Sequence, residues 1–286
     1  MKQNTYSRLR KWASIVSLAV LTLGSLAGQT QSQSNPPIKL YVFDMGTLKS
    51  ANPKPMLDLG ITTTDMSVTA YLVVHPRGLL LFDTGVIPDD QIKPEGTTVA
   101  RATVHKTLVG QLAEIGYKPS DITYLALSHG HYDHTANANE FAGATWIAQK
   151  AEREAMFGDS PPPRTYAPAT FSALKDSKTK LVDGDYDVFG DGTVMLLLTP
   201  GHTPGHQCLY VKLAKTGAVV LTGDLYHYPF ERTEKDANPY GGKVSGEESA
   251  SRAKIEAFLQ EKGATLWMGH DIIQCATLKK SPAHYE

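Results

Sequence analysis

The chain has 286 residues, of which 41% are hydrophobic and 20% are charged. This composition is typical of a globular protein and excludes a fibrous or intrinsically disordered one. The formal net charge is −1 and no basic run interrupts the sequence, so it carries no electrostatic footprint for nucleic acid. The length allows one large domain or two small ones.

Residues 1–28 have the pattern of a signal peptide. A basic start is followed by an uncharged run from Ala13 to Ala27, in which Ser25 and Ala27 have the spacing of a cleavage site. Residues 29–37 are rich in Gln and Ser and are expected to be disordered. The sequence therefore predicts a periplasmic or secreted protein without stable membrane association after cleavage. An uncleaved membrane anchor is the alternative, but the apolar run is shorter than the roughly 20 residues that span a bilayer.

Without residues 1–28 the chain keeps 24 Lys and Arg against 29 Asp and Glu, a net charge of −5. This mildly acidic balance favours a small or neutral partner. The sequence leaves a homodimer open.

No repeat or low-complexity linker divides residues 38–286, which are expected to form one domain. Helical spacing of apolar residues predicts helices over 98–115, 150–156 and 247–261. Gly116 would end the first helix, and Ser245 and Glu248 would begin the last as a capping box. Short apolar runs predict strands at 38–43, 69–74, 79–82, 122–127, 194–199, 207–213, 218–222 and 265–268. This order suggests two sheets packed face to face, with helices outside.

Cys208 and Cys275 are the two cysteines, too few for a disulfide framework. Cys208 lies in a strand-like run, which favours a buried apolar thiol. A single bridge between the two stays open in an oxidising compartment.

Residues 128–134, Ser-His-Gly-His-Tyr-Asp-His, follow an apolar strand and contain three of the ten histidines of the chain. Imidazole and carboxylate groups are the usual nitrogen and oxygen ligands of zinc. His129 and His131 would face one side, whereas Asp133 and His134 can turn toward a second point. A polar turn is the alternative, but so dense a set of ligands is hard to explain by solvation.

Three other strand ends offer the ligands that this loop lacks. His202 lies in a tight Pro- and Gly-rich turn, and His206 is expected to support the site from the next strand. Asp224 follows a glycine, and its carboxylate can bridge two metals. His270 is the seventh ligand.

Together these residues resemble the signature of the metallo-β-lactamase superfamily. His-x-His-x-Asp-His is followed by His202 after 68 residues, by Asp224 after 22 more and by His270 after 46 more. Asp83-Thr84-Gly85 is similar to the aspartate turn that supports the metals in that superfamily. The resemblance implies a single-domain αββα sandwich with a site for two metal ions at its edge. Four further stretches resemble the N-acyl homoserine lactonases, namely 116–119, 183–186, 199–207 and 269–272.

This resemblance implies a role for each ligand. His129, His131 and His202 would hold the first zinc. Asp133, His134 and His270 would hold the second zinc, and Asp224 would bridge the two. Manganese, cobalt or iron fit the same ligands.

The implied reaction opens the lactone ring of an N-acyl homoserine lactone by attack of a metal-bound hydroxide, with Asp133 as proton shuttle. One position departs from the lactonases. His227 stands where they have a tyrosine that contacts the substrate. Either neighbour, Tyr226 or Tyr228, is a candidate to replace that tyrosine, and Tyr226 and His227 are the expected substrate-binding residues. The aromatic residues of the loop 226–246 either line a groove for the acyl chain or pack onto the protein.

Two other functions stay open. A β-lactamase, a broad esterase or an organophosphate hydrolase can use the same site, although the usual β-lactamase patterns have Cys or Ser where this chain has Asp224. A non-catalytic metal-binding protein would more often have His-rich tracts than ligands dispersed over four strand ends.

Overall fold

The protein is described by a computed structural model that covers residues 36–286 except 161–162 and 235. The expected signal peptide, 1–28, and residues 29–35 of the stretch expected to be disordered lie outside the described residues. The described chain belongs to one compact unit, Asn35–Glu286. Among the helices of that part of the chain, none has the length and apolarity needed to cross a membrane.

The first sheet has nine strands in the order β4-β5-β1-β2-β3-β6-β7-β8, with β14 paired to β1. Strands β1, β2 and β3 pair antiparallel, whereas β3, β6, β7 and β8 pair parallel. The bounds are β1 Lys39–Leu48, β2 Met66–His75, β3 Gly78–Phe82, β4 Thr97–Val99, β5 Ala102–Val104, β6 Tyr124–Ala126, β7 Thr145–Gln149, β8 Thr179–Val182 and β14 His284–Tyr285.

The second sheet has five strands in the order β13-β12-β11-β10-β9. All neighbours are antiparallel except β12 and β13, which are parallel. The bounds are β9 Tyr186–Asp187, β10 Val194–Leu198, β11 Gln207–Leu213, β12 Gly217–Leu221 and β13 Thr265–Trp267.

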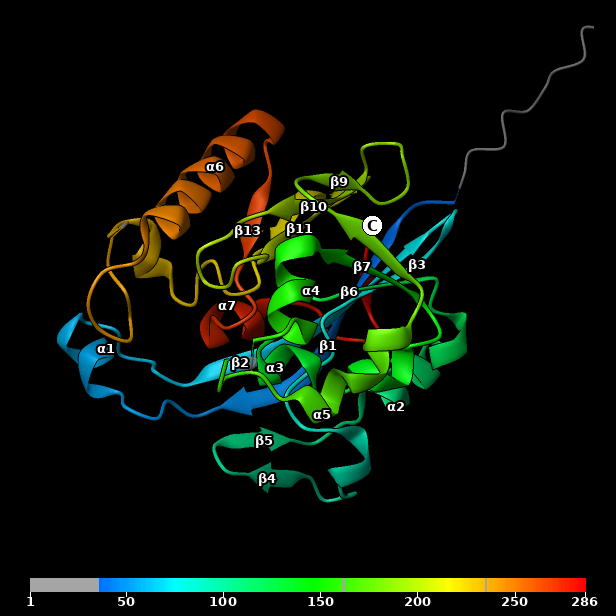
Figure 1. The fold of residues 1–286 in the computed structure, drawn as a ribbon, viewed down its shortest axis with the longest axis horizontal. Coiled ribbons are helices and arrows are strands. Elements are labelled where there is room, and N and C mark those ends of the chain that lie inside the picture. The colour runs from blue at the N-terminus through cyan, green and yellow to red at the C-terminus, as the bar shows by residue number, and fades with distance from the viewer. Residues whose placement is uncertain (1–35, 161–162, 235) are drawn as a thin grey trace, which may run out of the picture. The chain divides into compact units, whose positions relative to one another are not determined.

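Seven α-helices are present in the described residues, and α6 runs beside β13 (Figure 1, orange). Their bounds are α1 Lys54–Asp58, α2 Leu108–Glu114, α3 Tyr132–Thr135, α4 Lys150–Phe157, α5 Pro168–Phe171, α6 Gly246–Lys262 and α7 Ile272–Thr277. Short 3₁₀ helices occupy Asp89–Gln91, Pro119–Asp121, Ala138–Phe141, Ser172–Asp176 and Pro229–Arg232.

Three apolar clusters divide this unit into four layers. Side chains alternate along each strand, so each sheet has an inner and an outer apolar face. The inner faces meet in one core that joins residues such as Val42 and Val73 of the first sheet to Leu209 and Val211 of the second. The outer faces pack against α2 and α4 on one side and against α6 on the other. The expected αββα sandwich is therefore confirmed.

The helices expected at 150–156 and 247–261 are confirmed as α4 and α6. The Ser245 side chain accepts a hydrogen bond from the Glu248 main-chain N–H at 3.0 Å, as expected of the residue before a helix. The helix expected at 98–115 is wrong in its first half, because β4 and β5 form a hairpin there around Ala100, whose φ is +52°. β-Branched residues occupy all of β4 and two of the three positions of β5, and tertiary pairing of β5 with β1 overrides the apolar spacing.

Both cysteines are buried and free, so the bridge left open above is not formed. The Cys208 thiol lies 3.3 Å from the Thr222 carbonyl oxygen, to which it donates. Burial raises the pKa of this thiol to about 12, which makes it an inert part of the core between the second sheet and α6.

Candidate metal centre

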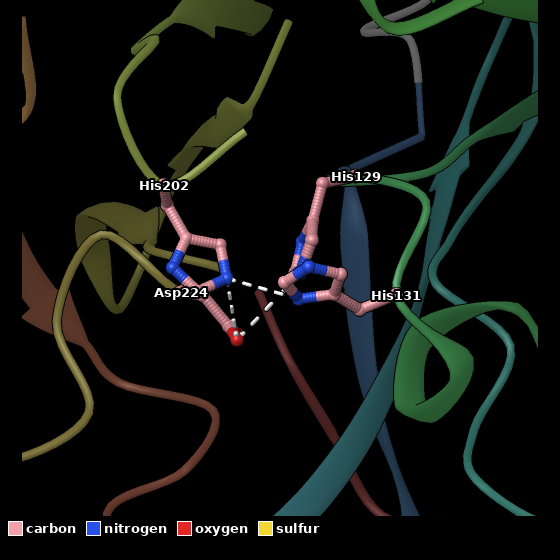
Figure 2. A group of neighbouring side chains, drawn as sticks. All are labelled: His129, His131, His202 and Asp224. Atoms are coloured by element: carbon pink, nitrogen blue, oxygen red, sulfur yellow. Dashed lines mark hydrogen bonds and ion pairs between the residues drawn. The ribbon is translucent and has the colours of Figure 1, made fainter. Parts of the chain in front are cut away.

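The expected ligands come from four loops, which follow β6, β10, β12 and β13. The loop after β6 contains α3, whose first turn includes Asp133 and His134. Figure 2 shows His129 and His131 from this loop facing His202 and Asp224, which come from the second sheet. The structure therefore brings together side chains from both sheets of the sandwich.

A first group consists of His129, His131, His202 and Asp224, whose donor atoms lie within 4.8 Å of one another. His202 Nε2 lies 3.1 Å from His131 Nδ1 and 3.3 Å from Asp224 Oδ2. His129 Nε2 lies 3.6 Å from the same carboxylate oxygen. Three imidazoles and one carboxylate oxygen thus surround a single point.

A second group consists of Asp133, His134 and His270. His270 Nε2 lies 3.6 Å from Asp133 Oδ2, and the Asp133 and His134 side chains approach to 4.0 Å. Asp224 Oδ1 faces this group, at 2.9 Å from His134 Nε2 and 3.0 Å from His270 Nε2. The two oxygens of Asp224 therefore face different groups, which is the arrangement of a bridging carboxylate.

Several buried polar atoms of the centre lack hydrogen-bond partners and could instead coordinate a metal. His129 Nε2, His134 Nε2 and Asp224 Oδ1 are buried and have no partner with hydrogen-bond geometry among the described residues. His131 Nδ1 and His202 Nε2 lie 3.1 Å apart, so without a cation one ring must donate to the other. A cation within each ligand group would satisfy these atoms, so the residues fit a metal site.

The protonation preferences of the imidazoles differ between the groups. Burial lowers the pKa of His129 well below its usual value and that of His131 to about 4, which keeps both rings neutral, as metal ligands must be. Burial acts in the same direction on His134, but Asp224 and Asp83 outweigh it and hold the pKa of His134 well above its usual value. A cation among these groups would compete with that proton.

Hydrogen bonds from behind orient the ligands. Asp83, whose φ is +62°, accepts from the Ser128 main-chain N–H at 2.6 Å and from His134 Nδ1 at 2.9 Å. His270 Nδ1 donates to the Ser67 carbonyl oxygen at 2.7 Å, which leaves Nε2 free for a metal. The expected aspartate turn is therefore present beside the centre.

His206 is buried behind Asp224 and is not in either group. Its Nε2 accepts a hydrogen bond from the Asp224 main-chain N–H at 3.0 Å, and its Nδ1 lies 2.8 Å from Thr199 Oγ1. This position agrees with the supporting role expected for His206. Asp271 accepts from the main-chain N–H groups of Ile273 and Gln274 at the start of α7.

A cavity of about 390 Å³ opens onto the centre. Asp133 and His227, two of the residues expected to act on the substrate, both line it. The His227 ring stacks on His270 with an interplanar angle of 4°, and its Nε2 lies 3.3 Å from Asp224 Oδ2. Burial lowers the pKa of His227, but Asp224 and Glu231 outweigh it and raise this pKa to about 10.

Tyr226 does not line this cavity, so its position does not support the expected contact with a substrate. Its ring packs against α6, and its hydroxyl donates to Glu256 at 3.3 Å. Tyr228 also points elsewhere, because its hydroxyl donates to the Thr64 carbonyl oxygen at 2.8 Å. Of the loop aromatics, Tyr240 lines the cavity, with its ring 5.2 Å from that of His227.

The sequence did not single out several residues around the centre. Arg101, on the β4–β5 hairpin, lines the cavity, and Glu152 and Tyr166 lie beneath the ligand loops. None of these residues belongs to a recognisable motif. Contacts between segments distant in the sequence, which spacing alone does not reveal, bring them to the site.

Comparison with known proteins gives one family. Residues 63–270 match the metallo-beta-lactamase superfamily. N-acyl homoserine lactonase AttM of Rhizobium radiobacter is 30% identical over 264 residues, which cover 87% of this chain and 98% of that protein. An N-acyl homoserine lactonase of Bacillus sp. is 31% identical over 229 residues, which cover 77% of this chain and 87% of that protein.

A solved structure of an N-acyl homoserine lactone hydrolase gives the same result. That structure holds the product N-hexanoyl-L-homoserine at its catalytic metal centre, and it superposes with a TM-score of 0.67. Its sequence is 25% identical, and the match covers 86% of this chain and 98% of that one. The chain therefore belongs to the metallo-β-lactamase superfamily, in the branch that contains the N-acyl homoserine lactonases.

Proposed function

We propose that the protein is a dinuclear zinc hydrolase that opens the lactone ring of N-acyl homoserine lactones. The observation that carries this proposal is Asp224, whose two oxygens face two separate ligand groups at the floor of one cavity. The N-acyl homoserine lactonases named above support the substrate class, because their sequences align with this chain over most of their length.

The donor atoms favour zinc. His129, His131 and His202 would hold one ion, and Asp133, His134 and His270 the other, with Asp224 shared. Nitrogen-rich sets suit zinc, whereas magnesium and calcium prefer all-oxygen sites. When bound, two such ions supply an acidified water and polarise the carbonyl group of an ester.

The residues of the chain then handle the substrate and the proton. Asp133 lines the cavity, and its carboxylate is positioned to carry a proton to the leaving oxygen of the opened ring. His227 and Tyr240 meet edge to face at the cavity wall, where an imidazole and a phenol can donate to the lactone carbonyl or the amide. This pair would replace the single tyrosine of the related lactonases.

The rest of the cavity fits an acyl chain with one polar group near the ring. Leu48, Ala51 and Met66 give apolar wall, and Arg101 adds a cation. The Arg101 guanidinium donates to the Lys49 carbonyl oxygen at 2.7 Å, which holds it at the hairpin turn. Such a wall suits a neutral amide with an aliphatic tail.

The proposal is tested by measuring, in a pH-stat, the acid released from N-hexanoyl and N-decanoyl homoserine lactone. Nitrocefin and paraoxon test the rival β-lactamase and organophosphate hydrolase functions in the same preparation. We expect the protein to open the lactones, a chelator to abolish this activity and zinc to restore it. The variants His131→Ala and Asp224→Asn should be inactive. A zinc-loaded protein that opens neither lactone but cleaves nitrocefin or paraoxon would refute the substrate, and a metal-loaded protein with no activity would favour a binding function.

We also propose that the protein acts outside the cytoplasm, on the basis of the signal-peptide pattern in residues 1–28. A diffusible lactone is available in that compartment. Fractionation of cells that express the full chain tests this proposal, and protein retained in the cytoplasm at full length would contradict it.

A further inference from the structure

Glu152 is a buried carboxylate in the first turn of α4, beneath the metal centre and outside both ligand groups. Its Oε1 accepts hydrogen bonds from the Gly130 main-chain N–H at 2.7 Å and from the Tyr166 hydroxyl at 2.6 Å. Its Oε2 accepts from the Thr203 hydroxyl at 2.7 Å and from the Gly205 main-chain N–H at 2.9 Å. All four partners are donors, which is the full capacity of a carboxylate.

Each oxygen of Glu152 holds a different ligand loop. Gly130 stands between His129 and His131, so Oε1 holds the loop after β6. Thr203 directly follows His202, so Oε2 holds the loop after β10. One rigid group therefore connects the backbones that present these imidazoles, whose facing nitrogens are 3.1 Å apart.

Two glycines allow both loops to approach this group closely. A Cβ atom on Gly130 would lie 2.4 Å from the Tyr166 ring, and one on Gly205 would lie 2.4 Å from the Glu152 main-chain nitrogen. Both distances are shorter than real contacts. The loops are therefore packed directly onto Glu152 and Tyr166, with no side chain between them.

Tyr166 extends this contact to a ligand. The main chain of Tyr166 pairs with that of His131 in an isolated antiparallel bridge. The centroids of the two rings are 5.4 Å apart, and the rings are nearly perpendicular. Glu152 thus constrains His131 through Gly130 on one side and through Tyr166 on the other. A buried charge is costly unless hydrogen bonds satisfy it, and here those bonds come from both ligand loops.

We infer that Glu152 is a positioning residue of the metal centre, which fixes the separation of His131 and His202 before a cation binds. The inference rests on the metal-binding part of the proposed function and is independent of the substrate. Glu152 touches neither the cation position nor the cavity, so it acts through the two loops.

Glu152→Gln tests this inference. The amide keeps the shape of the carboxylate, but its NH₂ group would face two donors where an oxygen now accepts, so one loop loses its attachment. The matched control is Asp187→Asn at the edge of the second sheet, where the carboxylate accepts from the Gly190 and Gly192 main-chain N–H groups. Both variants lose bonds to main-chain N–H groups, but Asp187 contacts no ligand loop.

The measurements are zinc affinity, by competition with a chromophoric chelator, and the visible spectrum of the cobalt-loaded protein. We expect Glu152→Gln to lower zinc affinity by about 10-fold to 100-fold, as for other residues that support metal ligands, and to alter the cobalt spectrum. Asp187→Asn should change neither, even where it lowers the melting temperature. Wild-type zinc affinity and an unchanged cobalt spectrum in Glu152→Gln would overturn the inference.

Tyr166→Phe and Thr203→Val each remove a single bond to one oxygen and decide the question if Glu152→Gln does not fold. Each should lower zinc affinity by less than Glu152→Gln, and wild-type affinity in both would also overturn the inference. Wild-type protein that binds zinc without opening lactones would refute the proposed substrate and leave the role of Glu152 standing.

Discussion

Replacing His206 with asparagine should weaken both the fold and the metal centre by removing one hydrogen bond to the Asp224 main chain. His206 Nε2 accepts from that buried N–H at 3.0 Å, whereas an asparagine side chain reaches only as far as the position of Nδ1. An unsatisfied buried donor costs about 1–3 kcal/mol, which lowers the melting temperature of a domain of this size by roughly 2–12 °C. Because Asp224 faces both ligand groups, zinc affinity should also fall by about 10-fold to 100-fold.

Thermal unfolding of the metal-free variant and a zinc competition titration measure these two effects. His206→Gln is the matched control, since a glutamine carbonyl oxygen reaches about as far as Nε2 and can still accept from the Asp224 N–H. The reasoning fails if the asparagine variant matches the glutamine variant in both stability and zinc affinity.

Four further predictions concern other parts of the molecule. Free zinc at about 100 times its dissociation constant should raise the free energy of unfolding by about 2.7 kcal/mol, and no shift on titration would contradict a metal site. Because burial holds the pKa of His75 below 6.5, the unfolded chain takes up that proton first. Stability should therefore fall below about pH 6.5, and less so in His75→Gln than in wild type when urea unfolding is compared from pH 7 to 5. Gly205→Ala, whose Cβ would meet the Glu152 main chain, should cost about 1–3 kcal/mol by urea unfolding, whereas Gly143→Ala faces open space and should cost less. N-terminal sequencing of exported protein should begin close to Gly28, and an intact Met1 would favour the membrane-anchor alternative.

The strands that precede the expected ligands were predictable because local pattern and site chemistry coincide there, whereas β7 and β8 were not predicted. The run 207–213 is β11 to the residue, and the apolar strands before His129, His202 and Asp224 each end three or four residues before the expected ligand. Ligand identity is a property of the residue itself, so imidazoles and carboxylates at strand ends could be recognised without knowing their partners.

What depended on tertiary pairing could not be predicted in this way. The hairpin β4–β5 exists because β5 pairs with the end of β1, some 50 residues earlier in the chain, and no local signal reveals that partner. The neighbours of Asp224 show the same limit. Tyr226 and Tyr228 are close to it in sequence but point away, whereas Tyr240 reaches the cavity from a distant part of the loop.

The division of the expected ligands between the two sheets has a consequence for the order of folding and metal binding. Sheet one contributes the cluster after β6, and sheet two contributes His202, Asp224 and His270, so each of the two ligand groups described above takes side chains from both halves. With the proposed ligand set, synthesis of the chain through His270 and docking of the two halves would have to precede full binding of two ions. Metal binding would then be a late step of folding, and the bound ions would link the two halves at that edge.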